Sequence, residues 1–136
     1  MGIRLLLAED NLHMADALAA VLAREPDIQI VAVVRSGSEA MDLADKLNPD
    51  VVVLDRAMPG VDGITAMRQI KEKHPALPVL ILTATAEPQV AESALAAGAA
   101  GFVVKDTAFD ELALAIRTVF EKKVYLSPRI ARRLVT

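Results

Sequence analysis

The stretch VVVLD, residues 51–55, decides the fold, together with the triplet MPG at residues 58–60, which must turn. Four consecutive apolar residues, three of them β-branched, are typical of a strand buried on both faces of a parallel sheet. In open α/β sheets, functional sites lie outside the carboxyl ends of such strands. Because Asp55 stands at that end, the stretch predicts a central strand and places Asp55 in a functional site.

Three other apolar runs also lead into polar side chains. These side chains are Glu9 and Asp10 after residues 3–8, Thr83 after residues 79–82, and Lys105 after residues 102–104. The carboxyl ends of parallel strands meet at one edge of a sheet, so we expect these groups to lie close together. Carboxylates suit a hard divalent cation such as Mg2+, which takes oxygen ligands and keeps several waters. A hydroxyl and an amine beside them suit a phosphoryl group.

Each of these residues also has a purely structural interpretation. Asp10 or Asn11 would cap the following helix, and Asp55 would only initiate a turn. Thr83 would be a β-branched strand end, and Lys105 a surface lysine. Three carboxylates gathered without a cation would repel and raise one another's pKa. A bound metal is the simplest way to hold them together, so we prefer the functional interpretation.

The whole chain alternates apolar runs with segments of helical period. The predicted strands are Ile3–Ala8, Ile28–Val34, Val51–Asp55, Val79–Thr83 and Gly101–Lys105. The predicted helices are Leu12–Arg24, Ser38–Leu47, Gly63–His74, Glu87–Ala97 and Phe109–Lys122. Five such units predict an α/β fold, a doubly wound five-stranded parallel sheet with five flanking helices.

Two details concern the carboxyl-terminal part. The helix Phe109–Lys122 is the clearest amphipathic segment, and its expected inward face is Phe109, Leu112, Ala113, Ile116 and Phe120. Ser127-Pro128 has the pattern of an N-cap followed by a first helical residue. It predicts a short last helix to about Leu134.

Composition excludes several classes of protein. With 136 residues, the chain is long enough for one domain and no more. It has no cysteine, so disulfides and thiolate metal sites are excluded. Net charge is −3 and no basic run occurs in the first hundred residues, so a nucleic-acid surface is not expected in the main body. No signal peptide or membrane-spanning run is evident, which makes a soluble cytoplasmic domain without membrane partners the default expectation.

The sequence from Ile3 to about Lys122 resembles the receiver domain of response regulators. Asp55 precedes Thr83 by 83 − 55 = 28 positions and Lys105 by 105 − 55 = 50, and both spacings are similar to those of the family. The other matching residues are Glu9-Asp10, Met58-Pro59-Gly60, Gly63, Ala84, Gly98 and Phe102. The ending Tyr125-Leu126-Ser127-Pro128 resembles NarL/FixJ-type (LuxR-type) transcriptional regulators of two-component systems. The resemblance implies a flavodoxin-like strand order, 2-1-3-4-5.

The resemblance also implies a role for each site residue. Asp55 would accept a phosphoryl group from a sensor histidine kinase or a small phosphodonor. Asp10, Asp55 and the backbone carbonyl of Ala57 would hold Mg2+, and Glu9 would act through a water. Lys105 would pair with the phosphoryl oxygens. The domain would be a phospho-acceptor of signalling, with self-phosphorylation and slow autodephosphorylation as its only catalysis.

Two further residues would form a switch. Thr83 would move toward the phosphoryl group, and Phe102 would follow as the coupled aromatic. We expect the changed surface of the fourth helix and fifth strand to promote a homodimer, with the first and last helices as an alternative face. The kinase, the signal and the target genes cannot be read from the sequence.

Two departures from the family pattern stand out. Arg56 occupies a position where an apolar residue is commoner, and Asp106 follows Lys105 where proline is common. Without proline a cis peptide costs roughly 3 kcal/mol, so we expect a trans bond there.

Residues 1–123 are expected to form the receiver, and 124–136 a C-terminal helix or the start of a linker to an output domain. DNA would be contacted only through a helix-turn-helix domain beyond this chain. The alternative is a stand-alone receiver that acts as a phosphorelay or interaction module. An aspartyl phosphatase would need a carboxylate at position 57, which is alanine, and a flavodoxin-like cofactor binder would need a Ser/Thr-rich loop where Glu9-Asp10 stands.

Overall fold

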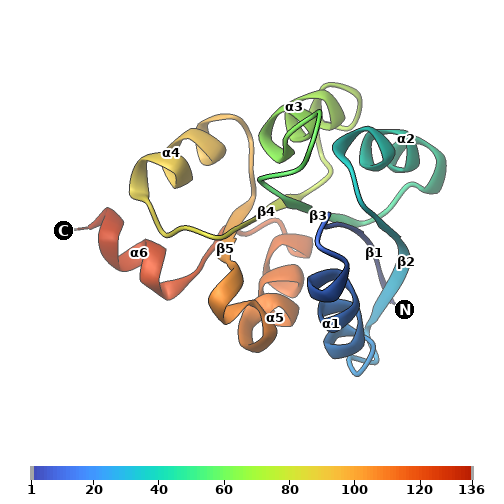
Figure 1. Ribbon diagram of the computed structural model, residues 1–136, viewed down its shortest axis with the longest axis horizontal. Helices are drawn as coiled ribbons and strands as arrows, with labels where there is room; N and C mark the ends of the chain where they lie inside the picture. The colour runs from blue at the N-terminus through green and yellow to red at the C-terminus, as the bar shows by residue number, and fades with distance from the viewer. Residues whose placement is uncertain (1, 136) are drawn as a thin grey trace.

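A computed structural model describes residues 2–135 and shows a parallel sheet with helices packed on both faces (Figure 1). All five predicted strands form, because each apolar run can bury side chains against helices on both sides. The strands are β1 (Ile3–Ala8), β2 (Ile28–Val34), β3 (Val51–Asp55), β4 (Val79–Thr83), β5 (Gly101–Val104) and β6 (Tyr125–Leu126). The helices are α1 (Leu12–Leu22), α2 (Gly37–Leu47), α3 (Gly63–Lys73), α4 (Pro88–Ala96), α5 (Ala108–Phe120) and α6 (Pro128–Leu134), with a 3-10 turn at Lys105–Thr107.

The sheet of the described residues has six strands in the order β2-β1-β3-β4-β5-β6, so the expectation of five was wrong. The sixth, β6, pairs in parallel with β5, with Gly101 opposite Tyr125 and Phe102 opposite Leu126. A two-residue strand is too short to show an alternating pattern, and it forms because β5 would otherwise present an unpaired edge. Gly101 permits this pairing, since a Cβ there would lie 2.6 Å from the carbonyl oxygen of Tyr125.

Two apolar cores lie on opposite sides of the sheet. Alternate residues of β3 belong to different cores, with Val51 and Val53 facing α1 and α5. Val52 and Leu54 face the other side, which α2, α3 and α4 cover, with α6 lying beside α4 (Figure 1). That second core also contains Phe102 of β5 and Ile130 of α6. The last helix is therefore packed into the domain.

Helix α5 is rotated relative to the expectation from its sequence. Its buried face is Ala108, Glu111, Leu112, Ala115, Ile116 and Val119. Leu112 and Ile116 point inward as predicted, whereas Phe109 and Phe120 are 41% and 42% exposed. The two stripes have the same helical period, and the structure favours the one containing Ala108 and Ala115. Small side chains at these positions let the helix approach the sheet closely. Within residues 2–135, no helix is both long and apolar enough to cross a membrane.

Candidate functional site

Strand register brings the predicted site residues to one edge of the sheet. Asp55 lies opposite Leu82, one residue before Thr83. Thr83 in turn lies opposite Val104, one residue before Lys105. The acid, the hydroxyl and the amine therefore gather at the carboxyl ends of β3, β4 and β5. Lys105 itself begins the 3-10 turn and is not the last residue of β5, as had been expected.

Three carboxylates form a cluster at this edge. Glu9, Asp10 and Asp55 each offer an oxygen, and these atoms lie within 4.8 Å of one another. Glu9 and Asp55 are buried, while Asp10 is partly exposed. The donor set consists only of oxygens and is open to solvent at one side, as a hard cation that keeps waters requires.

Lys105 lies against two of these carboxylates. Its ammonium nitrogen is 2.9 Å from Glu9 Oε1 and 3.1 Å from Asp55 Oδ2. Both oxygens are buried and accept no hydrogen bond of good geometry, so the ion pair with Lys105 is their main compensation. One ammonium facing three carboxylates leaves negative charge uncompensated. These under-satisfied oxygens fit a site for Mg2+.

The electrostatics of the cluster are strongly coupled. Burial raises the pKa of the Asp55 carboxyl to about 7, and the neighbouring Glu9 and Asp10 add to the rise. The pKa of Asp10 is lowered, chiefly by its hydrogen bond with Asp55. Burial disfavours the charge of Lys105, but its contacts with Glu9 and Asp55 outweigh this and raise its pKa. The pKa of Asp55 is thus raised while that of Asp10 is lowered, and a proton on Asp55 relieves the repulsion between the two.

Backbone groups hold the acidic loops in place. The amide of Asn11 donates to Glu9 Oε2 at 3.0 Å, and the Asn11 side chain caps α1 through the amide of Met14. The structural interpretation of Asn11 as a cap is therefore confirmed, and it coexists with the acidic cluster. The amide of Ala57 donates to Asp55 Oδ1 at 3.2 Å. This bond orients the carboxylate; the role of the Ala57 carbonyl toward Mg2+ remains a prediction.

Gly63 allows α3 to begin against the backbone of the acceptor. A Cβ at this position would lie 2.3 Å from the carbonyl oxygen of Asp55 and 2.9 Å from Cα of Arg56. The amide of Gly63 also donates to the carbonyl of Arg56 at 2.9 Å. Because the clashing atoms belong to the backbone, no side-chain rotation can make room.

We therefore expect Gly63→Ala to destabilise the domain by about 1–3 kcal/mol, the usual cost of overpacking. The urea midpoint of unfolding measures it. Gly2→Ala is the matched control, because a Cβ there meets its nearest atom at an ordinary 3.6 Å. Equal midpoints for Gly63→Ala and Gly2→Ala would show that the α3 start is not constrained as described.

The two proposed switch residues lie in adjacent strands. Thr83 is buried, and its Oγ1 accepts from the amide of Thr85 at 3.3 Å, which holds the loop after β4. Phe102 is fully buried in the core beneath α4 and α6. The structure thus shows Thr83 bonded to its own loop and Phe102 turned inward.

The two departures from the family pattern are also visible. Every peptide bond described in residues 2–135 is trans, including Lys105–Asp106, as expected. Asp106 forms an ion pair with Arg129 of α6 at 3.2 Å. Arg56 lines a surface hollow together with Ala57, Asp62 and Arg68.

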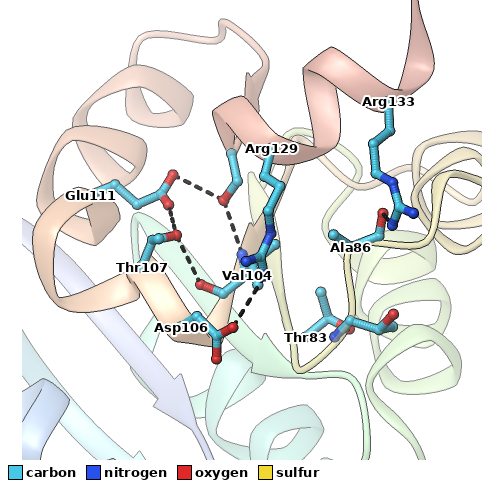
Figure 2. A network of polar contacts seen from close by, with 10 residues as sticks. Thr83, Ala86, Val104, Asp106, Thr107, Glu111, Arg129 and Arg133 are labelled. Atoms are coloured by element: carbon cyan, nitrogen blue, oxygen red, sulfur yellow. Dashed lines mark hydrogen bonds and ion pairs between the residues drawn. The ribbon is translucent and has the colours of Figure 1, made fainter. Parts of the chain in front are cut away.

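A buried carboxylate near Lys105 was not predicted from the sequence. Glu111 of α5 accepts hydrogen bonds from Tyr125 Oη at 2.6 Å and from Ser127 Oγ at 2.9 Å. It also accepts one from Thr107 Oγ1, which Figure 2 shows. Ser127 stands at the N-cap of α6, but its side chain does not cap the helix. Its hydroxyl instead accepts from the amide of Val104 at 2.9 Å. Glu111 was missed because the inward face predicted for α5 did not include it. The observed rotation of α5 places Glu111 on the buried face.

Comparison with known proteins gives the class to which this fold and site belong. The response regulator receiver domain family matches residues 5–117, which is most of the chain. The chain therefore belongs to this family. It is a family of signalling domains and not of catalytic enzymes. The match decides against the phosphatase and cofactor-binding alternatives.

The relatives narrow the class further. Response regulator GacA of Pseudomonas viridiflava is 36% identical over 132 residues, which cover 97% of this chain and 62% of GacA. A two-component response regulator of the LuxR family from Aurantimonas sp. SI85-9A1 has a crystal structure with a TM-score of 0.95 at 31% identity, covering 99% of this chain and 96% of that one. The isolated receiver domain of RcsB from Salmonella enterica, at 23% identity and a TM-score of 0.89, shares the fold over 98% of this chain and 99% of its own. The resemblance to NarL/FixJ-type (LuxR-type) regulators is thus confirmed, and the chain spans less than two thirds of the length of GacA.

Proposed function

We propose that Asp55 accepts a phosphoryl group from a sensor histidine kinase or a small phosphodonor in an Mg2+-dependent step. The observation that carries this proposal is the buried Asp55 carboxylate, which has a lysine ammonium 3.1 Å away and two further acids beside it. A lone acid at a strand end needs neither partner. A group that must bind a cation and a dianion in succession needs both.

The residues have separate tasks in this step. A carboxylate oxygen of Asp55 attacks the phosphorus atom, the bond from phosphorus to the donor breaks, and the leaving group keeps the electron pair. Lys105 would pair with the phosphoryl oxygens. Asp10, Asp55 and the Ala57 carbonyl would hold Mg2+, and Glu9 would act through a water. Bound Mg2+ supplies positive charge to the transferring oxygens and favours the ionised form of Asp55. Because burial raises the pKa of Asp55 to about 7, that second effect is needed near neutral pH.

Intact mass spectrometry tests the proposal. Incubation with acetyl phosphate and Mg2+ should add one phosphoryl group to the chain, and a chelator should prevent the addition. The product should be labile to hydroxylamine, as an acyl phosphate is. A phosphoryl group that resists hydroxylamine would place the modification on a hydroxyl and contradict the assignment.

The relatives favour an output beyond this chain. GacA and the other curated relatives are longer than this chain and are regulators, several of them transcriptional by name. We infer that the receiver controls a DNA-binding output domain, which alone would contact DNA. A stand-alone receiver remains the second candidate, and the length of the native chain decides between the two.

We expect phosphorylation to promote a homodimer through the Thr83 switch. Sedimentation of wild type and Thr83→Ala, with and without beryllofluoride as the phosphoryl mimic, tests this. Only the wild type should dimerise, because Thr83 can donate its hydroxyl to the bound mimic. Thr85→Ala is the matched control, since it removes a nearby hydroxyl that bonds Glu87 instead. Equal dimerisation of Thr83→Ala would remove Thr83 from the switch.

The exposed apolar side chains support a dimer face formed by α1 and α5. Phe109 and Leu114 of α5 and Leu12 of α1 are 41%, 56% and 52% exposed, and these two helices pack together. We therefore favour the face of the first and fifth helices for the dimer.

A further inference from the structure

Residues 125–134 are bonded to both loops that carry the phosphoryl-binding side chains. One loop follows β4, whose last residue is Thr83, and the other follows β5 and begins with Lys105. Figure 2 shows α6 crossing above both loops, with Arg129 reaching one and Arg133 the other. These bonds hold residues 125–134 against the domain, so the segment does not simply extend away from it.

The contacts to the β5 side surround Lys105. The amide of Ser127 donates to the carbonyl of Phe102 at 3.0 Å, and the amide of Val104 donates to Ser127 Oγ at 2.9 Å. On the other side of Lys105, Asp106 pairs with Arg129 at 3.2 Å. Bonds to the C-terminal segment therefore flank Lys105, and one of them is made to the backbone of Phe102, the proposed switch aromatic.

The contacts to the β4 side lead to Thr83. Arg133 Nη1 donates to the carbonyl of Ala86 at 3.2 Å. The loop that presents this carbonyl is held by the bond from the Thr85 amide to Thr83 Oγ1 at 3.3 Å. If the hydroxyl of Thr83 turns to a phosphoryl group on Asp55, the Thr85 amide loses its acceptor. The loop position that suits Arg133 is then no longer maintained.

An apolar anchor completes the docking. Ile130 is fully buried and shares its core with Ala91 and Ala94 of α4 and with Phe102. Helix α6 therefore covers the α4–β5 face, by which we mean the surface formed by α4 and β5. Movement of Phe102 would change the core into which Ile130 fits.

We propose that Tyr125–Leu134 is an autoinhibitory occupant of the α4–β5 face, docked in the unphosphorylated state and released when Asp55 is phosphorylated. The inference rests on the proposed function, because it uses the phosphoryl group as the trigger. The contacts of Tyr125–Leu134 fit the arrangement in which the Thr83 hydroxyl accepts from the amide of Thr85. By linkage, docking of the segment opposes phosphorylation as much as phosphorylation opposes docking.

Amide hydrogen exchange of residues 125–134 tests the release. Wild type and Asp55→Asn are measured with Mg2+, each with and without beryllofluoride. In the wild type, beryllofluoride should speed exchange in this segment about 5-fold or more, the lower end of typical allosteric coupling. Asp55→Asn should show no change. Fluorine NMR of the same samples reports whether beryllofluoride is bound.

Arg133→Ala provides the reverse test, with Arg132→Ala as its matched control. Arg133→Ala removes the bond to Ala86 and should bind beryllofluoride more tightly than wild type, with faster exchange of the segment before the mimic is added. Arg132→Ala removes the same charge from an exposed position of the same helix and should resemble wild type.

The outcomes distinguish failure of the release from failure of the proposed function. Bound beryllofluoride with unchanged or slower exchange in residues 125–134 overturns the release and leaves the proposed function standing. Weaker beryllofluoride binding by Arg133→Ala also overturns it, since docking would then favour the activated state. No bound beryllofluoride in the wild type would overturn the proposed function and this inference with it.

Discussion

Asp55→Asn will take up no phosphoryl group from acetyl phosphate and Mg2+, whereas the wild type takes up one. The loss is complete because a neutral amide oxygen is a much weaker nucleophile than a carboxylate oxygen. Asn is nearly isosteric with Asp, so the fold can persist, as can the hydrogen bond that the backbone amide of Ala57 donates to this side chain. Intact mass after incubation gives the result directly.

Asp62→Asn is the matched control for this prediction. Asp62 is an exposed carboxylate whose side chain caps α3 by accepting from the amide of Thr65 at 2.8 Å. Asn also caps helices well, so this variant should fold and be phosphorylated like the wild type. Uptake by Asp55→Asn at the wild-type level would show that another residue is the acceptor.

Mg2+ will stabilise the wild-type domain and will have little effect on Asp55→Asn. Glu9, Asp10 and Asp55 lie close enough to repel, and a cation bound only by the folded state relieves this. Saturation at 100 times the Kd stabilises by about 2.7 kcal/mol. That corresponds to an increase in Tm of roughly 5–10 °C for a domain of this size. Thermal unfolding with Mg2+ and with a chelator measures the difference.

The same cluster predicts a pH dependence in the absence of Mg2+. Because the folded state raises the pKa of Asp55 from 3.8 to about 7, it keeps a proton that the unfolded chain loses. Stability should therefore fall as pH rises through this window, and the loss should be complete above about pH 7. A shift from 3.8 to about 7 corresponds to about 4 kcal/mol, so Asp55→Asn should lack this contribution and be more stable than wild type at pH 8 by up to that amount. In the Mg2+ experiment described above, a wild-type Tm that is the same with Mg2+ and with a chelator would contradict the metal site.

The positions of the acceptor and its neighbours could be predicted from the sequence. An unbroken apolar run such as residues 51–55 has few alternatives to a buried parallel strand, and its last residue must then lie at the site edge. The same reasoning placed Thr83 correctly at the end of β4. Lys105, which was predicted as the last residue of β5, begins the 3-10 turn just after that strand. Periodicity alone sufficed here because strand ends are marked by a change from apolar to polar residues.

The rotation of α5 and the sixth strand could not be predicted in this way. Two stripes on α5 have the same period, and only the close approach allowed by Ala108 and Ala115 selects between them. That selection turns Phe109 outward and Glu111 inward. Strand β6 has two residues and no pattern of its own, so its place depends on the free edge of β5 and on Gly101.

The sequence by itself therefore determined which residues gather at the carboxyl edge of the sheet, because burial of apolar runs fixes where each strand ends. Tertiary structure alone decided how the C-terminal segment relates to them. Ser127 was expected to cap a helix, yet its hydroxyl joins Val104 to Glu111, residues 23 and 16 positions away. Such bonds form between groups that only packing brings together, and a buried polar group must take whichever partner lies within reach. The local sequence around Ser127 therefore does not indicate which distant residues its hydroxyl will bond.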